Sequence, residues 1–153
     1  MKLTQEQALE KIKNWCAYQE RYHKETKDKL FDFGLSKEEV EECLAQLISE
    51  NFLNEERFAI AFAGGKFRIK NWGKNKIKTE LRLRKVSDYS INKALKTINE
   101  EDYLKVLEKI VLKKWNSIQE KNEIKKTYKT LQYAVSRGFE SSLVSDCIKQ
   151  ITE

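Results

Sequence analysis

Three stretches of the sequence superimpose without gaps, and such an internal repeat leaves few architectures open. The stretches are KDKLFDFGLSKEEVEECLAQL (27–47), KTELRLRKVSDYSINKALKTI (78–98) and LQYAVSRGFESSLVSDCIKQI (131–151), at intervals of 51 and 53 residues. Few residues are identical, but the apolar positions agree and follow the period of an amphipathic helix. The repeat therefore predicts one small helical unit that is used three times.

Each stretch is typical of the end of one helix, a tight turn and a second helix. Gly34 and Gly138 lie just past a helix end, where a left-handed backbone is favoured and glycine meets no steric penalty. Lys85 takes this place in the middle copy. It predicts either a left-handed turn strained by about 1 kcal/mol or a turn that closes differently. Two residues further on, Ser36 and Ser87 are predicted to cap the next helices.

Another amphipathic segment precedes each stretch, with Thr4, Asn54 and Asn99 as start signals. We therefore predict an all-α fold: a tandem array of three three-helix repeats that forms an elongated, curved body. Its predicted repeats are residues 1–50, 51–98 and 99–153. The absence of proline, the five glycines and the 35% of charged residues all suit helices with solvated outer faces.

Residue types that carry out catalysis are scarce. With one histidine, His23, no Ser-His-Asp or Cys-His pair can be chosen, and we expect His23 to lie on the solvated surface. Cys16, Cys43 and Cys147 are far apart and form no CxxC pair, which predicts buried free thiols. The acidic run at 37–42 suits the first turn of a helix better than a metal site. We expect a non-enzyme with no catalytic residue, metal or cofactor.

The N-terminal residues MKLTQEQALEKI lack an apolar core of signal-peptide length. No run approaches the roughly 20 apolar residues that a membrane span needs. These observations predict a soluble cytoplasmic protein with no membrane partner.

The net charge of +6 is unevenly distributed along the chain. Residues 1–50 carry 8 basic and 11 acidic residues, residues 51–98 carry 12 and 4, and residues 99–153 carry 10 and 9. The middle third therefore holds more than the whole excess of positive charge. A field concentrated in this way attracts a polyanion more strongly than the same charge spread evenly.

Residues 66–85, KFRIKNWGKNKIKTELRLRK, hold nine basic residues and a single carboxylate, Glu80. Local ion pairing therefore leaves most of the charge free, and we predict a polyanion-binding surface, although a solvated face balanced by the acidic first third is the alternative. Phe67 and Trp72 either stack on exposed bases or, as we favour, pack between helices. Without an evident base-reading group, binding to nucleic acid alone should be weak, salt-sensitive and nearly independent of sequence.

Within this segment, Lys74, Lys78, Arg82 and Lys85 are spaced by four, four and three residues, which predicts one solvated ridge. The candidate binding residues are all basic and all lie in the middle repeat. They are Arg57, Lys66, Arg68, Lys70, Lys74, Lys76, Lys78, Arg82, Arg84 and Lys85.

Residues 52–95 resemble the RecX family, regulators of the bacterial recombinase RecA. The family pattern there is a Leu-Asn/Asp start, Arg-Phe-Ala, a basic helix, a glycine and a second helix with an Ile/Leu stripe. Arg137-Gly138-Phe139 is similar to its closing motif, and the resemblance spans about residues 8–151. Lys85, in place of a frequent glycine, and Glu55, near a common aspartate, depart from the pattern. The matching residues of the middle repeat are Leu53, Asn54, Arg57, Phe58, Ala59, Arg68, Gly73, Ile77 and Leu81.

The resemblance implies a non-enzymatic inhibitor that lies in the groove of the RecA–single-stranded DNA filament and restrains its ATPase, strand-exchange and co-protease activities. The implied partners are this filament and single-stranded DNA, with duplex DNA left open, and we expect a monomer. The alternative is a helix-turn-helix-like regulator of duplex DNA, which would concentrate its contacts on one recognition helix and dimerise. A protein-binding helical adaptor would leave the basic segment unexplained.

Overall fold

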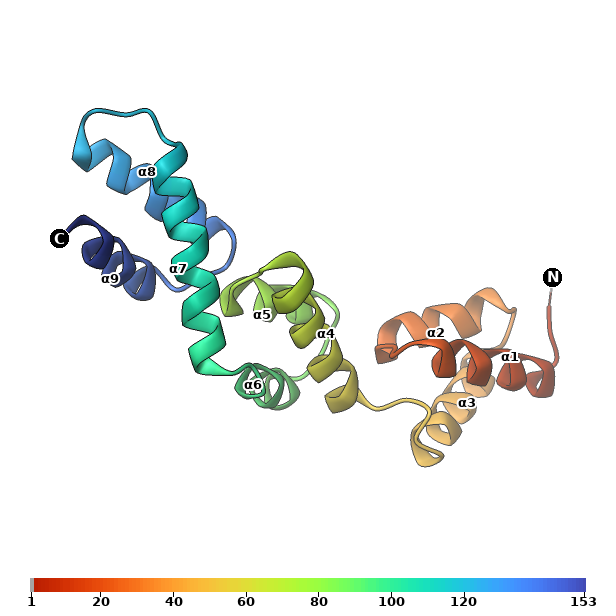
Figure 1. Ribbon diagram of the computed structural model, residues 1–153. Helices are drawn as coiled ribbons and strands as arrows, with labels where there is room; N and C mark the ends of the chain where they lie inside the picture. The colour runs from red at the N-terminus through yellow and green to blue at the C-terminus, as the bar shows by residue number, and fades with distance from the viewer. Residues whose placement is uncertain (1) are drawn as a thin grey trace.

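The structure is a computed structural model that describes residues 2–153, within which it contains nine α-helices and no strand (Figure 1). This confirms the all-α prediction. The helices are α1 (Gln5–Tyr18), α2 (His23–Asp32), α3 (Lys37–Ser49), α4 (Glu55–Lys70), α5 (Lys74–Leu83), α6 (Asp88–Lys96), α7 (Glu100–Ser117), α8 (Glu123–Ser136) and α9 (Ser141–Thr152).

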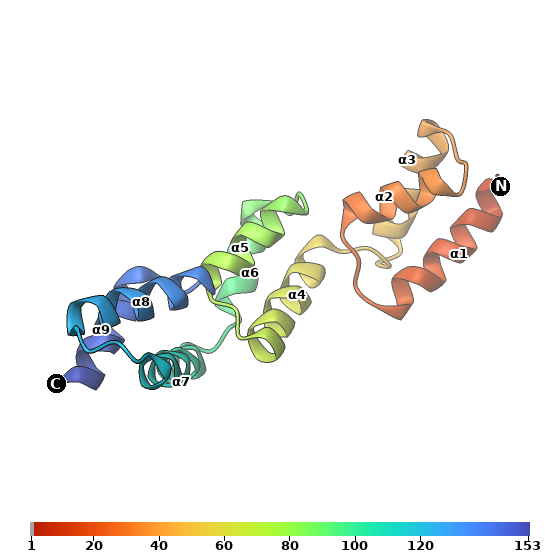
Figure 2. The same ribbon diagram turned by 90° about the horizontal axis from the view of Figure 1, so that it is seen from above.

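The helices group in threes, which we call unit 1 (α1–α3), unit 2 (α4–α6) and unit 3 (α7–α9). Within each unit the helices pack on one another, as α4 does on α5 and α6, and α7 does on α8 and α9. The units follow one another in space, so that the two chain ends lie at opposite ends of the molecule (Figures 1 and 2). The molecule is therefore an elongated array of helical units. None of its helices, in the part of the chain that is described, has the length and apolar character for crossing a membrane.

Local sequence signals set the starts of five helices. Each predicted cap has an extended backbone, and its side-chain oxygen accepts a hydrogen bond from the backbone N–H three residues further on. These bonds satisfy amides that the first turn of a helix otherwise leaves without a partner. The confirmed caps are Thr4, Ser36, Asn54, Ser87 and Asn99.

The three equivalent turns close with the same handedness. Gly34 has a φ of 89°, Gly138 of 102°, and Lys85 of 63°. Lys85 therefore adopts the strained left-handed conformation, and the middle turn does not close differently. Glu55, the other departure from the family pattern, accepts hydrogen bonds from the backbone N–H and the hydroxyl of Ser87 at 3.2 and 2.5 Å. It thereby ties the start of α4 to the start of α6.

Lys85→Gly should raise the free energy of unfolding by about 0.5–1 kcal/mol, because glycine removes the Cβ clash of a left-handed residue. Urea denaturation followed by circular dichroism measures this change. The matched control is Lys78→Gly in the middle of α5, which should lower the stability by about 1 kcal/mol. Destabilisation by both substitutions would show that the Lys85 turn carries no strain.

The apolar residues form two cores. One core belongs to unit 1, and the second runs without interruption through units 2 and 3. Cys16, Cys43 and Cys147 are buried free thiols, as predicted, and burial raises the pKa of Cys16 to about 11. Units 2 and 3 therefore share one packed core, whereas unit 1 has a core of its own.

His23 does not lie on the solvated surface, so that expectation was wrong. The side chain is half-buried, and its Nε2 atom has no hydrogen-bond partner among residues 2–153. His23 begins α2 beside Tyr22, whose ring packs on Phe58 of unit 2 at 5.2 Å between centroids. His23 thus lies at the junction of units 1 and 2, whereas its polar neighbours in the sequence had predicted an exposed position.

Backbone atoms hold units 2 and 3 together directly. The Gly73 N–H, at the start of α5, donates to the Arg137 carbonyl at 2.8 Å, and the Asn75 N–H donates to the Gly138 carbonyl at 2.9 Å. The buried Tyr103 of α7 adds a side-chain link, since its hydroxyl accepts a hydrogen bond from the Lys74 N–H at 2.9 Å. This junction fixes how the basic segment sits relative to unit 3.

Candidate nucleic-acid interface

A row of four aromatic rings runs from the start of α2 along α4 to the turn before α5. Tyr22, Phe58, Phe62 and Trp72 follow one another with centroid separations of 5.2, 5.7 and 6.3 Å. The rings are tilted or edge-on to their neighbours, as aromatic pairs prefer. This aromatic row joins unit 1 to unit 2 and forms the floor beneath part of the basic segment.

Three predicted binding residues lie over this row. The Lys66 Nζ atom is 5.4 Å from the centroid of Phe62 and 5.1 Å from that of Trp72. The Lys76 Nζ atom is 4.7 Å from the Trp72 ring, and the Arg84 guanidinium is 4.7 Å from the Phe62 ring. Ring faces attract cations at these distances. The aromatic row therefore holds positive charge in place, and Trp72 packs between helices as we favoured.

Arg57 is committed to a contact inside the molecule. Its Nε atom donates to the Glu20 carboxylate at 2.6 Å, and its Nη2 atom donates to the Asn51 carbonyl at 3.0 Å. Glu20 belongs to unit 1, 37 residues away in sequence. The arrangement places Arg57 at the junction of units 1 and 2, as a link between them.

Ion pairing reaches further into the basic segment than Glu80 alone allows. Most of the segment's charge stays free, as inferred: three of its nine basic residues are paired, two of them with carboxylates outside the segment. The pairs are Lys74 with Glu100 at 3.0 Å, Arg82 with Asp88 at 3.2 Å, and Arg84 with Glu80 at 3.6 Å. These pairs are partly exposed, so each contributes at most about 1 kcal/mol.

The predicted ridge is consequently divided. Lys74 points to unit 3, where its Nζ atom lies 4.6 Å from the Tyr103 ring, and its side chain is only 22% exposed. Lys78 and Lys85 have no ion-pair partner among residues 2–153. Across the whole segment, the basic residues without such a partner are Lys66, Arg68, Lys70, Lys76, Lys78 and Lys85.

We call these six residues the free basic surface. They lie near the end of α4, along α5 and on the turn that follows α5. Because no carboxylate neutralises them, they can contact phosphates without first breaking an ion pair. Elsewhere in the described residues, no cluster of three or more His, Cys, Asp or Glu side chains is placed to hold a metal ion.

A second basic surface, in unit 3, escaped the sequence analysis. Lys109, Lys113 and Lys114 lie on one side of α7 and line a hollow beside α8. Residues 99–153 have nearly balanced charge because acidic residues open α7, so a count over the whole repeat conceals this surface. The spacing of Lys109 and Lys113, one helical turn apart, was the signal that could have revealed it.

Comparisons with known proteins agree with this architecture. The family models described as "RecX, second three-helix domain" and "RecX, third three-helix domain" match residues 54–95 and 100–148, which together make up more than half of the chain. The first match contains the whole free basic surface. The second contains the three lysines of α7.

Curated relatives carry the name regulatory protein RecX. That of Haemophilus influenzae (strain PittGG) is 29% identical over 144 residues, which cover 94% of this chain and 93% of the relative. That of Clostridium perfringens (strain 13 / Type A) is 28% identical over 131 residues, which cover 84% of this chain. The match spans 61% of the length of the Clostridium protein.

Solved structures share the fold. The crystal structure of RecX from Lactobacillus salivarius superimposes with a TM-score of 0.88 at 20% identity, covering 97% of this chain and 96% of that one. A second crystal structure, of a regulatory protein RecX, gives a TM-score of 0.83 at 22% identity, covering 93% of this chain and 71% of the other. Sequence matches, repeated three-helix domains and fold together show that this chain belongs to the RecX family of regulatory proteins.

Proposed function

We propose that this protein is a non-enzymatic inhibitor of the RecA recombinase that binds in the groove of the RecA–single-stranded DNA filament. Membership of the RecX family supports the choice of partner. The observation that carries the mode of binding is the free basic surface of unit 2, which has no carboxylate partner in the described residues. A filament groove that contains DNA phosphates presents the complementary charge.

The array of units explains how binding would inhibit. Units 2 and 3 share one core, so a contact made by the free basic surface holds both units against the filament. A body in the groove stands in the way of incoming DNA and opposes the subunit movements that accompany ATP hydrolysis. Strand exchange, ATPase and co-protease activities would all fall, and the protein would thereby restrain DNA recombination, repair and the SOS response in the cytoplasm.

Affinity for DNA alone should be modest. The free basic surface offers phosphate contacts through flexible lysine and arginine side chains, and the aromatic row beneath it is covered by cations. Such contacts release counterions and weaken steeply as salt rises, without distinguishing bases. The protein acts as a monomer in this proposal, since no two-fold DNA site has to be matched.

The test measures RecA ATPase activity on single-stranded DNA while the protein is titrated at two salt concentrations. Wild type should inhibit. The variant Arg68→Glu/Lys78→Glu/Lys85→Glu should need roughly tenfold more protein for the same inhibition, because reversed charges repel phosphate. It spares Lys74 and Arg82, which pair with Glu100 and Asp88.

The matched control reverses three exposed lysines of unit 1, as Lys11→Glu/Lys27→Glu/Lys37→Glu, with the same change in net charge. It should inhibit nearly as well as wild type, and circular dichroism should show that both variants are folded. Full inhibition by the folded unit 2 variant would remove the free basic surface from the mechanism. Failure of wild type to inhibit its cognate recombinase would remove the proposed function.

A further inference from the structure

A hollow of about 490 Å³ lies between α7 and α8, next to the end of α4. Four cationic side chains line it: Lys109, Lys113 and Lys114 from α7, and Arg137 at the end of α8. No carboxylate is among the lining residues. Half of its lining side chains are thus cationic, and none is acidic.

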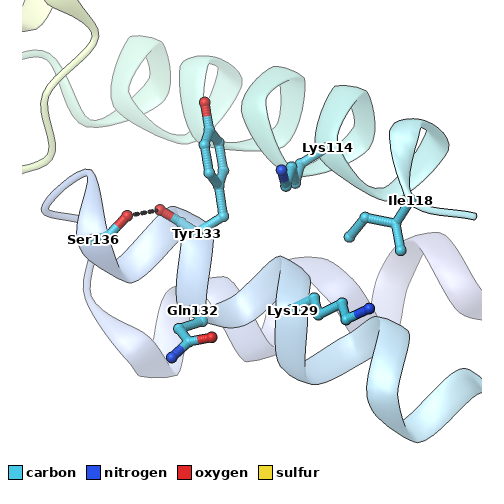
Figure 3. A pocket seen from close by; sticks show the side chains of 6 residues that line it. All are labelled: Lys114, Ile118, Lys129, Gln132, Tyr133 and Ser136. Carbon is cyan, nitrogen blue, oxygen red and sulfur yellow. Dashed lines mark hydrogen bonds between the residues drawn. The ribbon is translucent and has the colours of Figure 1, made fainter. Parts of the chain in front are cut away.

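A second hollow, of about 340 Å³, continues the first along the two helices. Lys114 and Tyr133 line both hollows, and Lys129 and Gln132 extend the lining on α8. Figure 3 shows that the Tyr133 side chain extends from α8 toward α7. Lys114 and then Ile118 follow to its right along α7. We call the two joined hollows the α7–α8 groove.

The lysines on the α7 side of the α7–α8 groove have no carboxylate to balance their charge. Lys109, Lys113 and Lys114 have no ion-pair partner among residues 2–153. The Lys114 Nζ atom lies 4.6 Å from the Tyr133 ring, and Arg137 is held in place by a hydrogen bond to the Lys70 carbonyl. Lys129, on the α8 side, pairs with Glu120 at 3.5 Å. The α7 side of the groove therefore presents a positioned positive surface that lacks an internal counterion.

The ring of Tyr133 indicates which class of anionic ligand fits the groove. Tyr133 is 37% exposed in the middle of the groove, and its exposed part can meet a planar group beside the Lys114 ammonium that lies over the ring. Single-stranded nucleic acid offers both chemistries at once, phosphates for the cations and bases that stack on aromatic rings. An acidic peptide offers carboxylates but lacks the stacking bases. We propose that the α7–α8 groove binds single-stranded nucleic acid, with Lys109, Lys113 and Lys114 on the phosphates and Tyr133 under a base.

The groove also connects with unit 2. Ser136 lines the second hollow and a third one, of about 350 Å³, whose lining includes Lys76 of the free basic surface. The one carboxylate there, Glu80, is paired with Arg84 at 3.6 Å. A single strand can thus follow the surface from unit 3 to unit 2. The groove adds a second DNA contact to the proposed function, but its test needs no recombinase.

The experiment measures binding of the full chain to a fluorescent oligothymidine strand by anisotropy over a range of salt concentrations. Lys109→Gln/Lys113→Gln/Lys114→Gln should weaken binding roughly tenfold or more at low salt. It should also lower the slope of log affinity against log salt by about two, at about 0.7 per lost phosphate contact. Tyr133→Ala should weaken binding about fivefold, whereas Tyr133→Phe should preserve it because the ring remains.

The matched control is Lys96→Gln/Lys125→Gln/Lys149→Gln, which removes the same charge from exposed positions outside the groove. Equal losses in the groove variant and the control would overturn the proposal. The proposal would also be overturned if polyglutamate displaced the strand and Tyr133→Ala left the affinity for the strand unchanged. That result would assign the groove to an acidic peptide. If the wild-type protein binds the strand through the groove but does not inhibit RecA, the proposed function is wrong and the groove proposal stands.

Discussion

Gly73→Ala should lower the free energy of unfolding by about 3 kcal/mol or more and loosen unit 2 from unit 3. Gly73 caps α5 with a φ of −76°, which alanine adopts freely, so backbone strain is not the cause. The cause is space. A Cβ atom at this position would lie far inside contact distance of the Gly138 carbonyl group and the Phe139 nitrogen.

Those neighbours are main-chain atoms, which cannot rotate out of the way as a side chain can. The clash is relieved only if the turn between α8 and α9 moves away from α5. That movement breaks the hydrogen bonds from Gly73 to Arg137 and from Asn75 to Gly138, of 2.8 and 2.9 Å. It also opens the core that units 2 and 3 share. The expected cost therefore exceeds that of an ordinary added methyl group.

Gly65→Ala is the matched control. Gly65 lies inside α4, where an added Cβ would meet no atom within 4 Å. Alanine favours the helix, so this variant should be more stable by about 0.5–1 kcal/mol. Urea denaturation of both variants measures the contrast, and small-angle scattering should show a more extended Gly73→Ala protein. Similar small effects in both variants would show that the junction tolerates a side chain.

Features that depend on neighbouring residues could be predicted from the sequence. The helical period, the caps at Ser36 and Asn54, and the glycine turns at Gly34 and Gly138 each arise within a few residues. The structure confirms them for that reason. The two other copies of the repeat also placed Lys85 at the turn position, but the sequence left open whether this turn is left-handed, as it is in the structure.

Features that depend on distant residues could not be predicted in this way. Gly73 matched a family position, but its need for glycine comes from Gly138, 65 positions later in the chain. Lys74 belonged by spacing to a solvated ridge, yet Glu100 of the next unit pairs with it. A residue's neighbours across a junction decide whether its charge is free, and a single sequence does not reveal them.

The two junctions are made of different kinds of contact, and this bears on function. Units 2 and 3 share a core and direct backbone bonds, so the free basic surface and the α7–α8 groove keep a fixed relation. Unit 1 is joined through side chains, chiefly the Tyr22–Phe58 ring contact and the Glu20–Arg57 ion pair. We therefore expect units 2 and 3 to engage a polyanion as one body, while unit 1 adjusts its angle.

Tyr103→Phe should lower the free energy of unfolding by about 1–3 kcal/mol at neutral pH. Tyr103 is fully buried at the junction of units 2 and 3, and its hydroxyl accepts a hydrogen bond from the Lys74 N–H at 2.9 Å while donating to the Glu140 carboxylate. Phenylalanine keeps the ring contacts with Phe67 and Phe139, at 5.7 and 5.2 Å. The loss of stability therefore comes only from the Lys74 amide and the Glu140 carboxylate, which are left without their hydrogen-bond partner.

The same residue predicts how stability changes at high pH. Burial, and then the hydrogen bond to Glu140, raise the pKa of Tyr103 well above its ordinary value near 10. Above pH 10 the unfolded chain loses this proton while the folded protein keeps it. The contribution of Tyr103 to the stability of the wild type is therefore fully present below pH 10 and is lost as the pH rises. The loss from this group is up to about 1.4 kcal/mol per pH unit.

Tyr103→Phe lacks the titrating hydroxyl, so the stability gap between wild type and variant should be constant from pH 7 to 9 and should shrink above pH 10. Urea denaturation at each pH measures the gap, in which titration of all other groups cancels. Tyr128→Phe, at a 61% exposed position on α8, is the control and should match wild type within about 0.5 kcal/mol at neutral pH. A gap for Tyr103→Phe that persisted unchanged to pH 11 would mean that the junction does not hold this proton, and that the Glu140 contact contributes little to joining units 2 and 3.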